Sequence, residues 1–154
     1  MIRIVTDSAA DLTAAELSVP GVFVVPLSVT FADGTTQLDD GTMTKDEFFA
    51  RLAEDSKLPR TSQPSPASFM QVYEDAEAAR DEVLVITIGQ KLSGTFQCAH
   101  LAAADVGLQA YIVDSEAASQ GEALLVREAV RLRDEEGLTA EEIAAVLEQF
   151  KKRV

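Results

Sequence analysis

The sequence has one cysteine, one histidine and no tryptophan, and it has half as many basic as acidic residues. With Cys98 alone, the chain cannot form an internal disulfide or a cysteine-based zinc site, which favours a reducing compartment. The 13 Lys and Arg against 26 Asp and Glu give a formal net charge of −13, and this charge repels nucleic acid and anionic lipid headgroups. We therefore expect no nucleic-acid partner.

Long apolar runs are missing as well. No stretch approaches the roughly 18 residues that span a bilayer, and the start "MIRIVTDSAAD" lacks the features of a signal peptide. The sequence therefore predicts no membrane span and a cytoplasmic location. Its 154 residues and 47% hydrophobic content predict one domain over residues 1–154, with a hydrophobic core of its own.

Short β-rich runs alternate with longer helical patterns along the chain. These runs occupy residues 2–6, 21–31, 82–88 and 108–113. Most of them are almost continuously apolar, which is typical of parallel strands covered on both faces. We therefore expect a layered α/β fold. The pair Asp33-Gly34 marks a tight turn, which predicts a hairpin or an edge excursion between residues 28 and 38.

Several helices are specified by the residues at their starts. Thr44 with Glu47 and Thr139 with Glu142 both match the capping box, in which a threonine hydroxyl and a glutamate carboxylate exchange hydrogen bonds with the first helical amides. Residues 118–136 form a further long helical pattern. The sequence therefore predicts helices that start near residues 45 and 140, and a third that ends before the glycine at 137.

Acids and hydroxyls follow three of the predicted strands. In open parallel sheets, ligands bind beyond the carboxyl ends of the strands, so these residues are candidates for a site. The alternative is helix capping, which uses the same residue types. We interpret Asp11 as such a cap, because "SAADL" resembles a turn into a short helix. The candidates are Asp7, Ser8, Ser93, Gly94, Asp114 and Ser115.

The stretch "RTSQPSPASF", residues 60–69, gathers hydroxyls and an amide at a helix entrance. Ser65 and Pro66 match an N-cap and a first helical residue. They leave Thr61 and Ser62 unexplained, while the two prolines stiffen the loop that carries them. Together with the Ser93-Gly94 helix entrance, these hydroxyls would form a cradle that suits one carboxylate better than a polyphosphate.

Catalytic alternatives have less support in the sequence. A serine hydrolase needs a base near its nucleophile, but His100 lies about 10 Å along the predicted helix from Ser93, so we expect it at the surface or core edge. Asp7, Asp11 and Asp114 could bind magnesium, which makes a metal-dependent phosphotransfer enzyme or subunit the alternative function. The usual phosphate-binding glycine loops are absent. A third hypothesis is that the chain is an interaction domain in which the polar residues of the loops serve only as helix caps.

Four separated segments resemble the successive motifs of the DegV family of bacterial fatty-acid-binding proteins. They are "VTDSAADL", "TSQPSP", "KLSGTFQCA" and "VDSEAASQG", in that order. The resemblance covers the whole chain but corresponds to about the first half of a family member. It implies a three-layer α/β/α domain with a mainly parallel sheet, and a second domain that is absent from this chain.

The resemblance also implies a function and its residues. Thr61, Ser62, Ser93 and Gly94 would hold the carboxylate of a long-chain fatty acid such as palmitate or oleate. Asp7, Ser8, Asp114 and Ser115 would shape the loops around it. The chain would be a carrier without a cofactor or metal, and it would present the acid to a fatty-acid kinase partner. An apolar tunnel wall left exposed by the missing domain would favour dimerisation or a partner chain.

Overall fold

A four-stranded parallel sheet forms the centre of the molecule, in a computed structural model that describes residues 1–55 and 57–154. Its strand order is β2-β1-β6-β7. Thr6 pairs with Val24 on one side and Ile86 on the other, so the carboxyl ends of neighbouring strands lie along one edge. The strands are β1 (Ile2–Asp7), β2 (Val22–Val25), β6 (Glu82–Thr87) and β7 (Ala110–Asp114).

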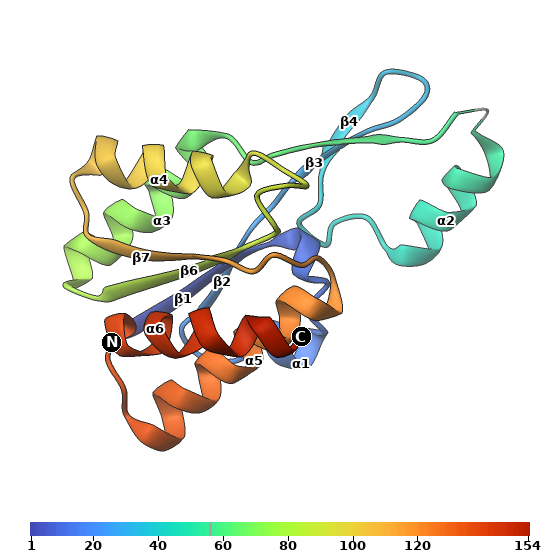
Figure 1. Ribbon diagram of the computed structural model, residues 1–154. Helices are drawn as coiled ribbons and strands as arrows, with labels where there is room; N and C mark the ends of the chain where they lie inside the picture. The colour runs from blue at the N-terminus through green and yellow to red at the C-terminus, as the bar shows by residue number, and fades with distance from the viewer. Residues whose placement is uncertain (56) are drawn as a thin grey trace.

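Helices cover both faces of this sheet (Figure 1). α3 (Pro66–Ala79) and α4 (Thr95–Val106) lie on one face, and α5 (Gln120–Arg131) and α6 (Ala140–Phe150) lie on the other. Val83 and Val85 pack toward the first pair, whereas Leu84 and Ile86 pack toward the second. Alternating side chains point to opposite faces, so an apolar run fills both cores. The expected three-layer α/β/α fold is confirmed.

The helix starts follow the capping signals. Both capping boxes are present, with Thr44 opening α2 (Lys45–Glu54) and Thr139 opening α6. Ser65 is the N-cap of α3 and Pro66 is its first residue. The helix expected over residues 118–136 begins at residue 120 as α5, continues as the π-helical segment η2 (Leu132–Glu136), and ends at Gly137, which has a φ of 66°.

None of the described helices is long and apolar enough to cross a membrane.

The apolar run at residues 21–31 is divided between two sheets, so treating it as one strand is wrong. β2 ends at Val25, and after Pro26 the chain enters β3 (Ser28–Thr30), which pairs antiparallel with β4 and β5. Proline has no amide hydrogen, so it cannot continue a ladder in the interior of a sheet. The hairpin expected between residues 28 and 38 is confirmed. Strands β4 and β5 span Thr36–Leu38 and Arg60–Ser62.

We call β3, β4, α2 and β5 the arm, because Figure 1 shows them extending away from the central sheet. A small aromatic cluster supports the arm. Phe31 is 3% exposed, its ring centroid lies 6.2 Å from that of Phe48, and the Arg51 guanidinium lies over it at 3.8 Å. Arg51 also pairs with Asp33 at the hairpin turn. The arm is therefore stabilised by a few side chains rather than by a two-sided core.

Candidate functional site

Asp7, at the carboxyl end of β1, joins two of the strand-end loops. Its Oδ2 accepts a hydrogen bond from the Ile88 amide at 2.8 Å, and its Oδ1 accepts one from the Ala9 amide at 3.0 Å. Burial raises the pKa of Asp7 to about 6, and these two amide hydrogen bonds oppose the increase. The carboxylate is therefore an internal brace between the loop after β1 and the loop after β6.

Asp114 and Ser115 make a similar brace at the end of β7. The Asp114 Oδ1 accepts hydrogen bonds from the Gln90 and Glu116 amides, both at 3.0 Å. The Ser115 Oγ accepts one from the Ala117 amide and donates one to the Ala117 carbonyl, both at 3.1 Å. These contacts fix the loop after β7 against the loop after β6.

Ser8 connects the same edge to the start of the arm. Its Oγ accepts a hydrogen bond from the Leu27 amide at 3.0 Å, where the chain passes from β2 to β3. All four residues expected to shape the loops are thus bonded to backbone groups of strand-end segments. Side chains fixed in this way hold a site close to its binding geometry before the ligand arrives.

The loop after β5 meets the entrance of α4. A Cβ atom added at Gly94 would lie 2.0 Å from the Oε1 of Gln63, so the glutamine side chain occupies the space that a larger residue would need. The Cys98 Sγ also donates a hydrogen bond to the Pro64 carbonyl at 3.3 Å. The two segments are 31 residues apart in the numbering, and the tertiary fold brings them into contact at Gln63 and Gly94.

The four residues expected to hold a carboxylate lie on both sides of this contact. Thr61 and Ser62 are exposed on β5, paired with β3 of the arm. Gly94 is the N-cap of α4 and has no side-chain cap, while the half-buried Ser93 places its Oγ 2.9 Å from the Thr95 hydroxyl. Amides at a helix N-terminus attract anions, which makes this entrance suitable for a carboxylate.

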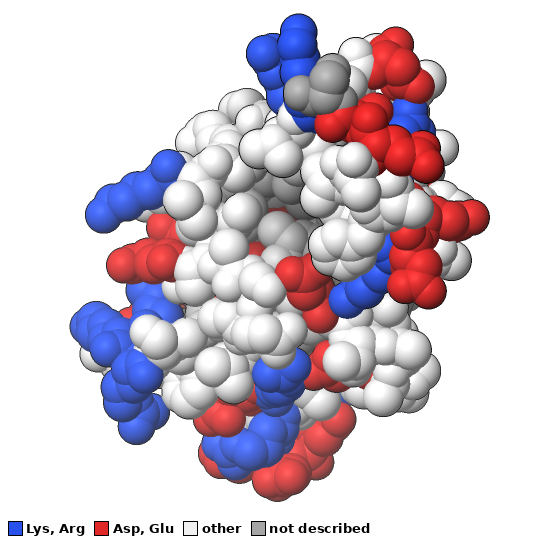
Figure 2. Space-filling view, turned by 90° about the vertical axis from the view of Figure 1, so that its right-hand side faces the viewer, with Lys and Arg blue, Asp and Glu red and all other residues white. Residues whose placement is uncertain are grey.

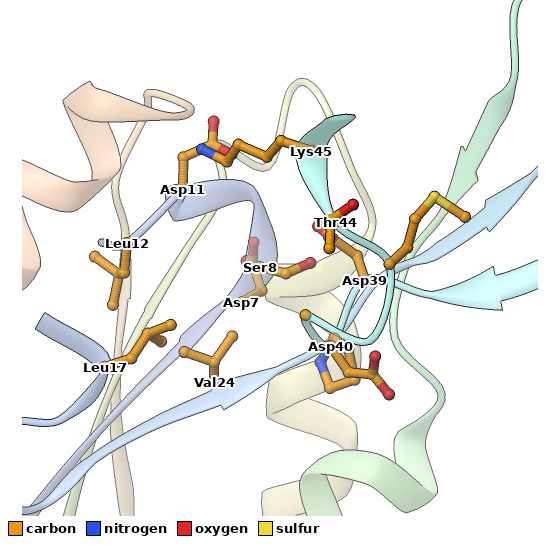
Figure 3. A pocket seen from close by; sticks show the side chains of 13 residues that line it. Asp7, Ser8, Asp11, Leu12, Leu17, Val24, Asp39, Asp40, Thr44 and Lys45 are labelled. Carbon is orange, nitrogen blue, oxygen red and sulfur yellow. The ribbon is translucent and has the colours of Figure 1, made fainter. Parts of the chain in front are cut away.

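A pocket of about 410 Å³ opens beside Asp7 and Ser8, at the junction with the arm. Figure 3 shows apolar side chains on one side of these two residues and arm residues on the other. Figure 2 shows this end of the molecule hollowed at its centre, between walls that are mostly uncharged. The carboxylate candidates do not line the pocket. It is lined by Asp7, Ser8, Asp11, Leu12, Leu17, Val24, Pro26, Asp39, Asp40, Gly41, Met43, Thr44 and Lys45.

The structure contradicts the interpretation of Asp11 and confirms that of His100. Asp11 is not the N-cap of a short helix: it ends the 3-10 turn η1 (Ser8–Ala10) and accepts a hydrogen bond from the Ser119 hydroxyl at 2.7 Å. Thr13 caps α1 (Ala14–Leu17) instead, because the turn that Asp7 caps comes first. The placement of His100 at the surface is confirmed, where its ring lies against Phe96.

The metal-site alternative has no support in the geometry. Asp7 and Asp114 direct carboxylate oxygens to backbone amides. Among residues 1–55 and 57–154, no three His, Cys, Asp or Glu side chains gather in a way that could hold a metal ion. Two residues outside the predicted site also lie at this edge. They are Gln63, on the loop that meets Gly94, and Glu122, which lies buried beside Asp7.

The fold defines a three-layer α/β/α domain whose strand-end loops are braced by side-chain hydrogen bonds at the carboxyl edge of the sheet. The chain belongs to the DegV family, because the family model described as "Uncharacterised protein, DegV family" matches residues 1–154. A DegV domain-containing protein of Caldanaerobacter subterraneus is 36% identical over 154 residues, which are 99% of this chain and 54% of that protein. A protein of Thermotoga maritima named "Fatty acid-binding protein" is 34% identical over 153 residues, 98% of this chain and 53% of that protein.

Solved structures share the fold. A DegV family protein from Thermus thermophilus, described for its fatty acid binding, superposes with a TM-score of 0.87 and 40% identity, over 98% of this chain and 53% of that chain. The Streptococcus pneumoniae Fatty Acid Kinase (Fak) B3 protein, loaded with linoleic acid, has a TM-score of 0.84 over 99% of this chain and 54% of its own. At 24% identity, the second likeness establishes the fold alone. The chain spans about half the length of these relatives.

Proposed function

We propose that this chain binds the carboxylate of a long-chain fatty acid, such as palmitate or oleate, as the α/β half of a DegV-type carrier. The observation that carries the proposal is the contact between Gln63 and Gly94, because it joins the loop bearing Thr61 and Ser62 to the helix entrance bearing Ser93. The relatives named for fatty acid binding, at 34% and 40% identity, support the same ligand class.

The donors at this edge suit one carboxylate. Hydroxyls of Thr61, Ser62 and Ser93 can donate hydrogen bonds, and α4 begins after Gly94 without a side-chain cap, so a headgroup can interact with its first amides. Each hydrogen bond to a charged group is worth about 1.5–3 kcal/mol. Two or three such contacts orient the acid and leave most of the affinity to its tail.

Large exposed apolar side chains precede both halves of the proposed headgroup site in the sequence. Leu92 directly precedes Ser93 and is 66% exposed, and Leu58 precedes β5 and is 79% exposed. Each methylene that an acyl chain buries against such surfaces contributes about 0.8 kcal/mol. An acyl tail that covers these side chains would therefore supply the strength of binding, while the hydroxyls select the acid.

We further propose that the chain is a carrier, and that an ATP-binding kinase partner phosphorylates the bound carboxylate to an acyl phosphate. The partner would transfer the terminal phosphoryl group of ATP to a carboxylate oxygen and release ADP. The carrier would contribute orientation rather than a catalytic group. Because the reaction consumes ATP, the proposal assigns the protein to the cytoplasm.

The proposal is tested by the lipid that the protein retains. The chain is purified from a bacterial host, denatured and extracted, and the extract is analysed by mass spectrometry; we expect about one equivalent of long-chain fatty acid. Thr61→Val and Ser93→Ala should each lower oleate affinity by about tenfold or more, as expected for a lost charge-assisted hydrogen bond.

Ser18→Ala is the matched control, because Ser18 is an exposed serine just before β2 enters the sheet at its opposite edge. It should leave oleate affinity unchanged. If Ser93→Ala instead lowers stability by about 1 kcal/mol without any effect on oleate, the serine is a cap and the proposal is wrong.

A further inference from the structure

Glu122 is a buried acid that the proposed headgroup site does not use. It is 0% exposed in the first turn of α5, where its Oε1 accepts a hydrogen bond from the Thr6 hydroxyl at 2.9 Å. Its Oε2 is buried and has no hydrogen-bond partner. An ionised carboxylate with one unbonded buried oxygen is costly, so this geometry favours the neutral acid.

The charged groups that act on Glu122 are themselves acids. Asp7 faces it from β1, and Asp11 faces it from the end of η1. Lys45, at the start of α2, lines the same pocket as these two aspartates. Burial raises the pKa of Glu122 to about 9, and the negative charge of Asp7 adds to the increase. Two neighbouring buried carboxyls do not ionise together, so near neutral pH Glu122 holds the proton and Asp7 holds the charge.

Backbone hydrogen bonds connect the Asp7 carboxylate to the loop that carries Ser93. Asp7 holds the Ile88 amide, and the next residue, Gly89, accepts hydrogen bonds at its carbonyl from the Leu92 amide at 2.8 Å and the Ser93 amide at 3.2 Å. Ser93 is therefore positioned by a tight turn that begins at Gly89, directly after the residue whose amide the Asp7 carboxylate holds. A second negative charge beside Asp7 would repel its carboxylate and weaken its hold on Ile88.

We infer that Glu122 is a positioning residue for the headgroup site: held uncharged, it leaves Asp7 as the one charged member of this buried pair, and the Asp7 carboxylate braces Ile88 and so helps to place Ser93. This inference rests on the proposed function. Glu122 touches no ligand in this scheme and acts through Asp7. Its effect is a pH window for fatty acid binding, which closes on the alkaline side when Glu122 ionises.

The test compares oleate affinity between pH 7 and pH 9.5 for the wild-type chain and Glu122→Gln. Glutamine keeps the shape and the Thr6 hydrogen bond but cannot ionise. We expect equal affinity near pH 7, and a fall of about threefold or more for the wild type at pH 9.5, since half a pH unit above a pKa leaves about three-quarters of a group ionised. Glu122→Gln should show no such fall.

Glu116→Gln is the control, because it removes an exposed negative charge from the same edge of the sheet. It should follow the wild type at each pH. An equal alkaline fall in Glu122→Gln and the wild type would overturn the inference, because the loss would then come from another group.

A ligand-free measurement separates the inference from the proposed function and does not depend on the variant's folding. The ¹³C shifts of the Asp7 and Glu122 carboxyl carbons are followed with pH in the wild type, together with the Ile88 amide. We expect Glu122 to be protonated at pH 7 and the Ile88 shift to change as Glu122 ionises. A charged Glu122 at pH 7 would overturn the inference, whereas failure of oleate to bind at any pH would overturn the proposed function alone.

Discussion

The central sheet and the arm are both β structure, but they are stabilised in different ways. Residues 83–87 of β6 are all buried, whereas β4 and β5 are exposed along their whole length. The central sheet has helices on both faces, and the arm depends on pairing between short strands and on the cluster around Phe31. The central sheet is stabilised by apolar side chains buried on both of its faces, whereas the arm is stabilised by strand pairing and a few side-chain contacts.

This difference matters because the proposed headgroup site uses both regions. Ser93 and Gly94 are placed by the braced loops of the central sheet, whereas Thr61 and Ser62 belong to the arm. The side with fewer buried contacts can open without unfolding the protein, because local opening costs less where little apolar surface is buried. Ligand release would then begin at β5.

The largest effect should come from the centre of the sheet. Leu84→Ala removes a fully buried side chain and leaves a cavity, and it should lower the free energy of unfolding by about 3–4 kcal/mol. Leu38→Ala in the arm removes the same atoms from a side chain that is 50% exposed, and it should cost less than about 1 kcal/mol. Urea denaturation measures both, and equal costs would mean that the two regions share one core.

The second largest effect should be a pH-dependent change in stability caused by Glu122. Burial raises the pKa of Glu122 from 4.5 to about 9, so its contribution is most favourable below pH 4.5 and is lost as the pH rises toward 9. The free energy of unfolding of Glu122→Gln, relative to that of the wild type, should therefore increase by on the order of 3 kcal/mol between pH 5 and pH 8.

Glu47 in the arm should behave in the opposite way. Hydrogen bonds from Thr44 lower the pKa of Glu47, so its contribution to stability is lost as the pH falls below 4.5.

Urea unfolding at several pH values checks this contrast. Glu47→Gln should differ from the wild type by a constant amount above about pH 6, where Glu47 is almost fully ionised in both the folded and unfolded states. A constant difference for Glu122→Gln as well would mean that Glu122 is ionised in the folded protein.

A smaller effect, confined to one region, is expected for Phe31→Ala. Loss of this ring removes the contacts with Phe48 and Arg51, and it should destabilise the arm by about 2 kcal/mol while the central sheet stays folded. Hydrogen exchange by mass spectrometry should show faster exchange in peptides from the arm and unchanged exchange in β6. Faster exchange in both would show that the regions unfold together.

The smallest effect is the loss of a capping box in each region. Thr139→Ala and Thr44→Ala remove the same hydrogen bonds from α6 and α2, each worth about 1 kcal/mol. Thr139→Ala should lower global stability by this amount, because α6 covers the central sheet. Thr44→Ala should increase exchange in α2 alone. A shift in the global urea midpoint by Thr44→Ala would contradict the separation of the two regions.

Short sequence motifs predicted helix starts best where the residues of the motif have a single structural role. The two capping boxes and the Ser65-Pro66 start are examples, because their hydrogen bonds close within four residues. Pro26 was a comparable signal for the break between β2 and β3, but the apolar run on both sides obscured it. Asp11 was misassigned because an aspartate can cap a turn, end one or bind a neighbour, and sequence spacing does not separate these uses.

The site was predictable in its residue types but not in its connections. Asp7, Ser8, Asp114 and Ser115 were selected as strand-end residues, and the structure adds the backbone partner of each one. Glu122 lies three residues before the buried Leu125, so helical periodicity could have indicated that it points inward. Its neutral state could not have been inferred, because that depends on its burial in the folded protein and on Asp7, which is 115 positions away in the numbering.

By itself, the sequence determined the alternation of strands and helices, the helix starts and the family, because each of these is written in nearby residues or in their order. Only the tertiary structure decided that Gln63 lies against Gly94 and that Glu122 lies beside Asp7. The physical reason is that such contacts depend on how distant segments share one sheet edge, and their energies arise from burial and from charges that meet only after folding.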